Sequence, residues 1–369
     1  MKVAIDILPL KNANRYRGVG TYTNQLVESL KSLNIPNFSF QLIEGGGITK
    51  DCDLIHYPFF DPFFLTLPLK KTKPTVVTIH DVIPLVFPEH FPAGIRGTIK
   101  FQIQKFSLRN VKAIITDSEN SKNDLFKYLN YPKEKIFMVP LAPAEDFKVI
   151  KDKNLLKKIK ERCQLPENFI LYVGDVNYNK NVSGLIRAFA QIEHRTENIE
   201  HRLKLVLVGK AFLDENLKET KAILQSIKNL SLRSRTLFLT GARNNSLKFN
   251  KEVIRLGWVP QEDLVGIYNL ATVYCQPSFY EGFGLPVLEA MACGCPVVAA
   301  NTSSLPEIYG EAAVRIDPYD INNMAEGIRK VIGDKVIRNT LRKKGLKWVK
   351  NFSWDKVARK TYEVYQKVV

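Results

Sequence analysis

Residues 274–308 read YCQPSFYEGFGLPVLEAMACGCPVVAANTSSLPEI, and this stretch decides the fold of the second half of the chain. A short apolar run, a glycine-containing loop, a helical segment beginning near Pro286 and another apolar run follow one another within 35 residues. That order is typical of a strand, a helix and the next strand of a parallel sheet. Since Gly282 and Gly284 permit positive φ and close backbone approach, we expect N–H groups to converge at the helix start, which favours phosphate binding.

Two acidic residues accompany this loop. Glu281 lies within it, and Glu289 lies about one turn into the helix, so we expect their carboxylates to bracket the anion site without touching each other. A carboxylate can accept hydrogen bonds from two sugar hydroxyls, which suits one glutamate to a ribose and the other to a transferred sugar. Taken singly, each glutamate is explained as well by a place on the protein surface as by a functional role. Their combination with the glycine loop favours the functional role.

Short β-branched runs alternate with longer amphipathic segments along the whole chain, which predicts an α/β protein with parallel sheets. The runs fall into two series, separated by a lysine-rich connection near residues 146–168. We therefore expect one domain over residues 1–150 and a second over residues 165–350. The last amphipathic segment, 352–369, follows an already complete domain, and we expect it to pack back on the first one.

Composition narrows the function classes. The formal charge of +17 suits anionic partners, but compact basic stripes interleaved with aromatic residues, the pattern of nucleic-acid binding, are missing from the sequence. The longest apolar runs fall short of the ~18 residues that a membrane span needs. The five cysteines are scattered and odd in number, which is typical of a reducing compartment. We expect a cytoplasmic protein.

The segment at residues 95–110 carries two apolar stripes at helical spacing. Ile95, Ile99, Ile103 and Phe106 share one face, and we expect this face to be core. A second face holds Phe101 and Leu108 between basic residues. It favours a plain buried helix, and peripheral contact with the inner face of a membrane is the alternative.

Further polar residues and glycines follow predicted strands. Lys180 follows the first strand of the second domain by a short loop, where a cation suits a diphosphate. His80 ends a strand of the first domain, and open α/β sheets bind ligands at such strand ends; a core histidine is the alternative. His56 has a similar position and is a candidate for an acceptor side. Gly18 and Gly20 predict a glycine loop that a diphosphate can approach.

Two other functions are disfavoured by spacing. A dinucleotide-binding loop needs a third glycine three positions after Gly20, and Thr23 stands there. Asp51 and Asp53 spell the D-x-D string of metal-dependent sugar transferases, but they precede a strand instead of following one. We therefore expect neither a cofactor nor a required metal.

Residues 281–307 resemble the signature of the retaining glycosyltransferases of family 4, in which two glutamates stand eight positions apart. Those enzymes have the GT-B fold, two Rossmann-like parallel-sheet domains facing across a cleft, with the donor site in the second domain and the acceptor mainly in the first. The resemblance continues through RGVGTYT, TIHDVIP, AIITDSENSKNDL, YVGDVNYNKN, LVGK, GWVPQEDLVGIYNLA and FSWDKVA.

The resemblance implies a role for each candidate. Glu289 would hold the ribose of a nucleoside-diphosphate sugar, Glu281 and His80 would lie beside the transferred sugar, and Lys180 would bind the diphosphate. Backbone contacts to the phosphates or the sugar would come from Phe283, Gly284 and Leu285. Such enzymes retain the anomeric configuration by front-face displacement, which needs leaving-group stabilisation more than a strong nucleophile.

Two positions depart from the family pattern. Family members often have a basic residue directly after Gly174 or directly before Lys180, and this chain has Asp175 and Asn179 instead. Arg17 or another donor would then complete the phosphate site.

The segment at 78–91, TIHDVIPLVFPEHF, most resembles the mannosyltransferase branch. GDP-mannose is therefore the expected donor, with UDP-glucose or UDP-N-acetylglucosamine next, and the expected acceptor is a hydroxyl of a glycan or glycolipid in polysaccharide biosynthesis. A nucleotide-sugar epimerase, a sucrose-synthase-like enzyme and a non-catalytic sugar-binding protein on the same fold are the alternatives.

Overall fold

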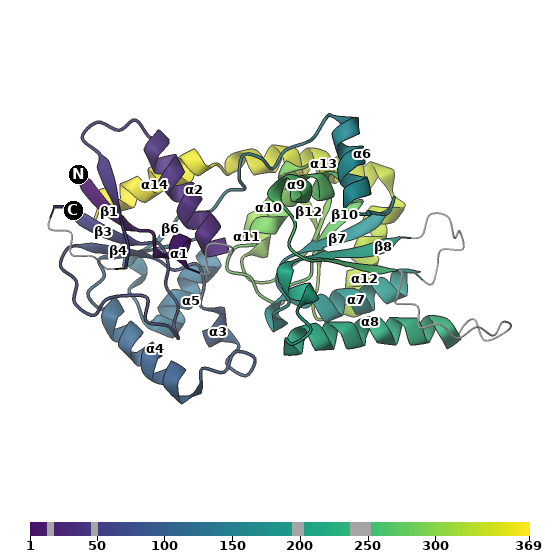
Figure 1. Cartoon of the computed structure of the whole chain (residues 1–369), viewed down its shortest axis with the longest axis horizontal. Helices are drawn as coiled ribbons and strands as arrows, with labels where there is room; N and C mark the ends of the chain where they lie inside the picture. The colour runs from purple at the N-terminus through teal and green to yellow at the C-terminus, as the bar shows by residue number, and fades with distance from the viewer. Residues whose placement is uncertain (13–17, 46–50, 194–202, 237–251) are drawn as a thin grey trace. The chain divides into compact units, whose positions relative to one another are not determined.

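The computed structural model describes residues 1–12, 18–45, 51–193, 203–236 and 252–369, and it divides into two compact units. Unit 1 comprises Met1–Ala144 and Phe352–Val369, and unit 2 comprises Glu145–Asn351. Each unit contains a six-stranded sheet with helices on both faces (Figure 1). The α/β class predicted from the alternating pattern is confirmed. The apolar run at 236–241 (TLFLTG), which we count among the predicted strands of the second series, lies almost wholly outside the described residues.

In unit 1 the strands lie in the order β2-β1-β3-β4-β5-β6, and every neighbouring pair is parallel. The central strands are buried along their whole length, as expected for a parallel sheet covered on both faces. The strands are β1 (Lys2–Asp6), β2 (Ser39–Ile43), β3 (Leu54–Tyr57), β4 (Thr75–Thr78), β5 (Ala113–Thr116) and β6 (Ile136–Met138). The helices are α1 (Leu8–Lys11), α2 (Gly18–Ser32), α3 (Ile83–Val86), α4 (Gly94–Leu108), α5 (Glu119–Leu129), η2 (Lys133–Lys135) and α14 (Trp354–Gln366).

In unit 2 the order is β12-β11-β10-β7-β8-β9, again with parallel neighbours. The strands are β7 (Phe169–Val173), β8 (Lys204–Val208), β9 (Val253–Leu256), β10 (Val273–Gln276), β11 (Val297–Ala300) and β12 (Ala313–Ile316). The helices are α6 (Lys153–Arg162), η3 (Tyr178–Lys180), α7 (Val182–Glu193), η5 (Lys210–Leu213), α8 (Lys218–Thr236), α9 (Gln261–Leu270), α10 (Leu285–Ala292), α11 (Leu305–Tyr309), α12 (Ile321–Gly333), α13 (Lys335–Trp348) and η6 (Val349–Asn351).

The last helix, α14, belongs to unit 1, where it packs against α2 (Figure 1). Ser353 caps its first turn by accepting a hydrogen bond from the Lys356 N–H at 3.3 Å. At its other end, the buried Tyr365 hydroxyl lies 2.7 Å from Nδ1 of His56 on β3. The chain therefore returns to unit 1 after completing unit 2.

Helix α4 presents the opposite face from the one expected. Ile95, Ile99 and Phe106 are 84%, 56% and 54% exposed, so the stripe predicted to be core faces solvent. Leu108 is buried and Phe101 packs against the core of unit 1, so the stripe considered for membrane contact is the inner one. The core assignment of the first stripe was therefore wrong, and the buried-helix interpretation of the second stripe is confirmed.

A buried polar side chain explains the inversion. Gln104 of α4 is fully buried and serves the loop that follows β3: its amide N–H groups donate to Thr66 Oγ1 at 2.6 Å and to the Asp61 carbonyl at 3.2 Å. Its side-chain carbonyl accepts from the Leu67 N–H at 3.3 Å. Buried backbone groups must be paired, and the helix orients the glutamine that pairs them towards the core.

A close backbone approach at the ends of β7 and β8 yields a stability prediction. A Cβ at Gly209 would lie 2.1 Å from the carbonyl oxygen of Gly174, so Gly209→Ala requires the two strand ends to separate. We expect this substitution to lower the free energy of unfolding by about 1–3 kcal/mol, measured by urea denaturation followed by circular dichroism. The matched control is Gly333→Ala at the end of α12, where a Cβ meets nothing within 4 Å and stability should be unchanged or higher. Equal midpoints for the two variants would contradict the prediction.

Candidate active site

The strand order of unit 2 fixes where a ligand can bind. The chain runs outward in opposite directions from the neighbouring strands β7 and β10, so the loops after these two strands diverge. Open α/β sheets bind ligands at such a switch point, outside the carboxyl ends of the strands. Lys180 comes from the loop after β7, and Glu281 comes from the loop after β10.

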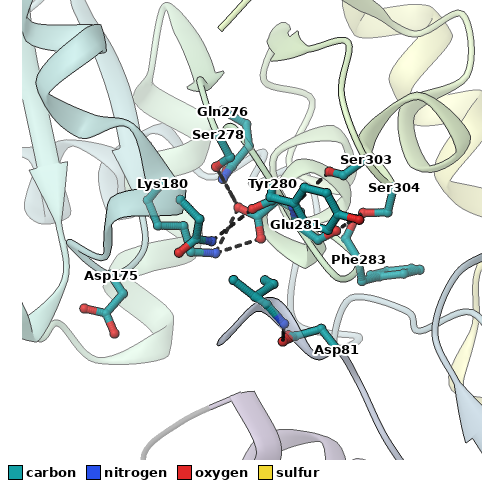
Figure 2. Close-up of polar contacts among 12 residues, drawn as sticks. Asp81, Asp175, Lys180, Gln276, Ser278, Tyr280, Glu281, Phe283, Ser303 and Ser304 are labelled. Atoms are coloured by element: carbon teal, nitrogen blue, oxygen red, sulfur yellow. Dashed lines mark hydrogen bonds and ion pairs between the residues drawn. The ribbon is translucent and has the colours of Figure 1, made fainter. Parts of the chain in front are cut away.

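Figure 2 shows these two side chains in contact. The Lys180 ammonium lies 2.9 Å from Oε1 and 2.7 Å from Oε2 of Glu281. Oε1 also accepts hydrogen bonds from Gln276 Nε2 and from Ser278 Oγ, both at 2.7 Å. Glu281 is only 5% exposed, so its charge is held away from water and is compensated by these three donors.

Gln276 and Ser278 were not singled out from the sequence. Gln276 is the last residue of β10, and both side chains are buried. A signal was present in the sequence, since Gln276 ends a buried strand and Ser278 follows it, directly before the glycine loop. Polar groups at that place need partners, and Glu281 is theirs.

The loop after β10 is held in place from the segment that follows β11. Ser303 Oγ accepts from the Glu281 N–H at 2.9 Å, and Ser304 Oγ lies 3.0 Å from the Glu281 carbonyl and 2.9 Å from the Phe283 carbonyl (Figure 2). Gly284 adopts φ of 103°, and a Cβ there would lie 2.7 Å from Leu305 Cδ2. Glycine is therefore required at this helix start, and α10 begins at the next residue, close to the predicted Pro286.

Glu289 lies in a different environment one turn into α10. Its Oε2 accepts a hydrogen bond from the Tyr268 hydroxyl of α9 at 2.9 Å. Burial disfavours the charged carboxylate and, against the opposing effect of this hydrogen bond, raises the pKa of Glu289 from its ordinary value of 4.5 to about 7. Glu289 is thus a group whose charge depends on pH near neutrality.

Asn179 stands where family members often have a basic residue, and the structure gives it a different task. It is buried at 2% exposure, its side-chain amide donates to the Tyr280 carbonyl at 2.9 Å, and its own carbonyl accepts from the Phe279 N–H at 2.8 Å. Asn179 therefore binds the loop after β7 to the loop after β10. Asp175 is exposed and accepts from the Val176 N–H at 2.8 Å, so it closes its own turn. Arg17 lies outside the described residues.

In unit 1, His80 follows β4 and pairs with Asp117, which follows β5. The distance between His80 Nδ1 and Asp117 Oδ2 is 2.7 Å, and the Tyr22 ring lies edge-on against the imidazole, with centroids 4.6 Å apart. Burial disfavours the charged ring, but the Asp117 carboxylate outweighs that effect and raises the pKa of His80. Among the described residues His80 Nε2 has no hydrogen-bond partner, which suits it to a ligand oxygen.

His56, considered for the acceptor side, is instead a core histidine. It is fully buried on β3, and its two ring nitrogens lie within hydrogen-bond distance of Tyr365 and Thr78. Burial lowers its pKa to about 3, so the ring is neutral at physiological pH. Both nitrogens are used inside the protein, and the acceptor-side interpretation was wrong.

The remaining candidates from the sequence are the two glycines near the start of α2 and the two aspartates of the D-x-D string. Gly18 and Gly20 lie in the first turn of α2 instead of in a loop, after residues outside the described part. Asp53 Oδ2 accepts a hydrogen bond from the Lys2 N–H at 2.8 Å, and the Asp51 carboxylate pairs with the Lys2 side chain. Both aspartates therefore bind the first residue of β1. In the part of the chain that the structure describes, His, Cys, Asp and Glu side chains form no group of three suited to a metal ion.

Two family models match this chain. The family model described as glycosyl transferases group 1 matches residues 167–334, and the model described as Glycosyltransferase Family 4 matches residues 34–142. The first match covers the sheet that carries Lys180 and Glu281, and the second covers most of unit 1.

Related sequences are also glycosyltransferases by name. The O-antigen chain mannosyltransferase B of Escherichia coli is 30% identical over 318 residues, which cover 85% of this chain and 75% of that protein. A serotype-specific mannosyltransferase of Escherichia coli, WbdA, is 28% identical over 286 residues. These cover 77% of this chain but 32% of WbdA, so the chain spans about a third of that relative.

Solved structures support the fold. A sucrose-phosphate synthase from Thermosynechococcus elongatus has a TM-score of 0.73 at 20% identity and covers 100% of this chain and 98% of its own. Anabaena HepE, solved in complex with UDP and glucose, has a TM-score of 0.71 at 17% identity, with both chains covered completely. With two parallel-sheet units in the GT-B architecture and a relative at 30% identity, the chain belongs to glycosyltransferase family 4.

Proposed function

We propose that this protein is a retaining, metal-independent hexosyltransferase that moves mannose from GDP-mannose to a hydroxyl of a glycan or glycolipid. UDP-glucose and UDP-N-acetylglucosamine are the next donors in order. The Lys180–Glu281 pair at the β7/β10 switch point carries the proposal. The choice of mannose is supported by the names of the relatives from Escherichia coli.

We propose that Lys180 contacts the diphosphate of the donor and that Glu281 contacts its sugar. An ammonium has three protons, and Lys180 uses two of them on Glu281, which leaves the third for a phosphate oxygen. Among the described residues Oε2 of Glu281 accepts from Lys180 alone, so it has capacity for a sugar hydroxyl. The start of α10, at Gly284 and Leu285, adds N–H groups and the positive end of a helix dipole for the diphosphate.

The proposed reaction breaks the bond between C1 of the sugar and the phosphate oxygen, and its electron pair leaves with the nucleoside diphosphate. The acceptor hydroxyl attacks C1 from the same face, and its proton passes to the departing phosphate oxygen. Charge develops on the leaving group, where Lys180 and the α10 terminus stabilise it. His80, in unit 1, is proposed to donate from Nε2 to a hydroxyl of the transferred sugar.

Removal of the ammonium tests the central contact. We expect Lys180→Ala to lower the rate of transfer from GDP-mannose by about 10²–10³-fold, because a stabilising donor is lost from the leaving group. The double variant Lys180→Ala with Glu281→Gln removes the stranded buried charge, so it should recover thermal stability without recovering transfer. Lys330→Ala, an exposed lysine of α12, is the matched control. Full activity of Lys180→Ala would refute the assignment.

A ligand screen tests the donor. A molecule that binds the native state alone raises stability by about 2.7 kcal/mol at a hundred times its dissociation constant. We expect GDP to raise the melting temperature more than UDP, ADP or dTDP, and GDP-mannose to give an α-linked product by NMR. A larger shift with UDP would mean that the donor is a UDP-sugar and not GDP-mannose. An epimerised sugar or a free sugar as the product would mean that the proposed transfer reaction is wrong.

The raised pKa of Glu289 predicts pH-dependent donor binding. We propose that the Glu289 carboxylate accepts the ribose hydroxyls, which requires its charged form. With a pKa of about 7, the charged fraction rises about tenfold between pH 6 and pH 8, and the affinity for GDP-mannose should rise with it. Calorimetry on Glu289→Gln should show weaker binding of GDP-mannose and no rise in affinity between pH 6 and pH 8. Ionisation of the ligand affects both proteins equally, so it cancels when the two pH profiles are compared. The same pH profile in both proteins would contradict the ribose role.

Peripheral membrane contact is part of the proposal, through the solvent-facing stripe of α4 and not through the stripe chosen from sequence. Among the described residues no helix is long and apolar enough to cross a bilayer. The exposed Ile95, Ile99 and Phe106 alternate with basic residues, and α4 contains no acidic residue. The neighbouring loop adds exposed Phe64, whose ring lies 5.2 Å from the Lys100 ammonium. Apolar side chains framed by cations suit the surface of an anionic bilayer.

Vesicle sedimentation tests the membrane surface. We expect the wild-type protein to bind vesicles of phosphatidylglycerol and phosphatidylcholine, and less so at high salt. Ile95→Ser with Ile99→Ser should weaken binding more than about tenfold, because two large apolar side chains no longer enter the interface. Val336→Ser, which changes an exposed valine of α13, should bind as wild type. Wild-type protein that stays in solution, or that self-associates through this stripe, would refute membrane contact.

A further inference from the structure

Three aromatic rings form a row on the surface of unit 2. The Phe279 ring stacks on Tyr319, with centroids 4.8 Å apart and planes 22° apart, and it tilts against Tyr178 with centroids 5.3 Å apart. Phe279 is half-buried between its neighbours, whereas Tyr178 is 38% exposed and Tyr319 is 65% exposed. Large exposed rings at one place are a feature of binding surfaces, because they offer apolar area with little loss of conformational entropy.

The row is assembled from three separate loops that are bonded to each other. Asn179 joins the Tyr178 loop to the Phe279 loop, as described above. Asn181, in the left-handed conformation with φ of 52°, donates from its side-chain amide to the carbonyls of Pro277 at 3.1 Å and Pro318 at 2.8 Å. The rings are therefore held by buried amides and not by their own contacts alone.

The third loop is rigid for reasons of its own. Asp317 Oδ1 accepts from the Tyr319 N–H at 2.9 Å, and the Asp317 N–H donates to Asn323 at 2.8 Å. Asp320 caps α12 by accepting from the N–H groups of Asn322 and Asn323. Tyr319 thus projects from a fixed turn, which makes its ring a preformed surface.

The row belongs to the sugar side of the proposed donor site. Tyr178 stands two residues before Lys180, and Phe279 stands two residues before Glu281. Two of the three aromatic loops lead into α7 and α12, which pack together on one face of the sheet, whereas the Phe279 loop leads into α10, which carries Glu289 and covers the other face (Figure 1). A nucleoside whose ribose contacts Glu289 is therefore expected on the α10 side, away from Tyr178 and Tyr319.

We propose that Tyr178, Phe279 and Tyr319 form a subsite for a pyranose ring of the glycan acceptor. The apolar C–H face of the sugar packs on the exposed ring of Tyr319, and the tyrosine hydroxyls pair with sugar hydroxyls at the edges. This subsite rests on the proposed glycosyltransfer function, and it places part of the acceptor site in unit 2 instead of leaving it wholly to unit 1.

Binding without turnover tests the subsite independently of the reaction. We would titrate mannotriose, maltotriose and chitotriose into the donor-free protein and follow saturation transfer from protein to sugar by NMR. We expect at least one trisaccharide to bind, Tyr319→Ala to weaken it about tenfold, and Tyr319→Phe to retain most of the affinity because the ring remains. Leu213→Ala, which removes an exposed apolar side chain from η5, is the control. Binding of no trisaccharide, or equal binding by Tyr319→Ala, would overturn the proposal.

Kinetics separate this subsite from the donor site. In a transfer assay Tyr319→Ala should raise KM for the acceptor about tenfold and leave KM for the donor unchanged. If the variant instead weakens GDP-mannose binding, the rings stack a nucleobase and the acceptor assignment is wrong. If no donor supports transfer by the wild type but the trisaccharides still bind through Tyr319, the subsite stands and the proposed function fails.

Discussion

A buried carboxylate needs compensation, and in unit 2 that requirement organises the loops. Glu281 keeps its charge out of water only because Lys180, Gln276 and Ser278 surround it. These partners lie at or after the ends of two strands, β7 and β10, that are adjacent in the sheet and about a hundred residues apart in sequence. Leaving one member of a buried ion pair alone costs about 3–5 kcal/mol, so neither loop can move away from the other cheaply. The protein's own side chains therefore fix the two loops relative to each other.

Asn179 shows how this constraint bears on a departure from the family pattern. A basic side chain at that position would place a second cation beside Lys180, where a diphosphate could use it. This chain has a neutral amide that is almost completely buried and joins two backbones. This chain thus lacks a second cation beside Lys180, but its two loops are joined more rigidly, and these loops hold the aromatic row. A site with fewer cations relies more on the N–H groups of α10 for the leaving diphosphate.

Sequence reasoning succeeded where a pattern has one physical meaning. Alternating β-branched and amphipathic segments predicted two parallel sheets, and the start of α10 at Leu285 lies beside the predicted Pro286. It failed where a pattern has two meanings. Helical periodicity shows which residues of α4 share a face, but the buried face was decided by Gln104, whose partners lie in a loop about forty residues earlier. For His56, the deciding partner was Tyr365, at the far end of the chain.

The two glutamates of the motif show that a residue type alone does not predict the environment of its side chain. Glu281 and Glu289 are the same residue eight positions apart, yet the first faces an ammonium and the second faces a phenol. A phenol donates one hydrogen bond without a charge, so burial dominates at Glu289 and raises its pKa to about 7. At Glu281 the Lys180 ammonium makes a direct, charge-assisted contact with the carboxylate. Lys180 and Tyr268, which make this difference, are 101 and 21 residues from their partners, and only the folded sheet brings each to its carboxylate.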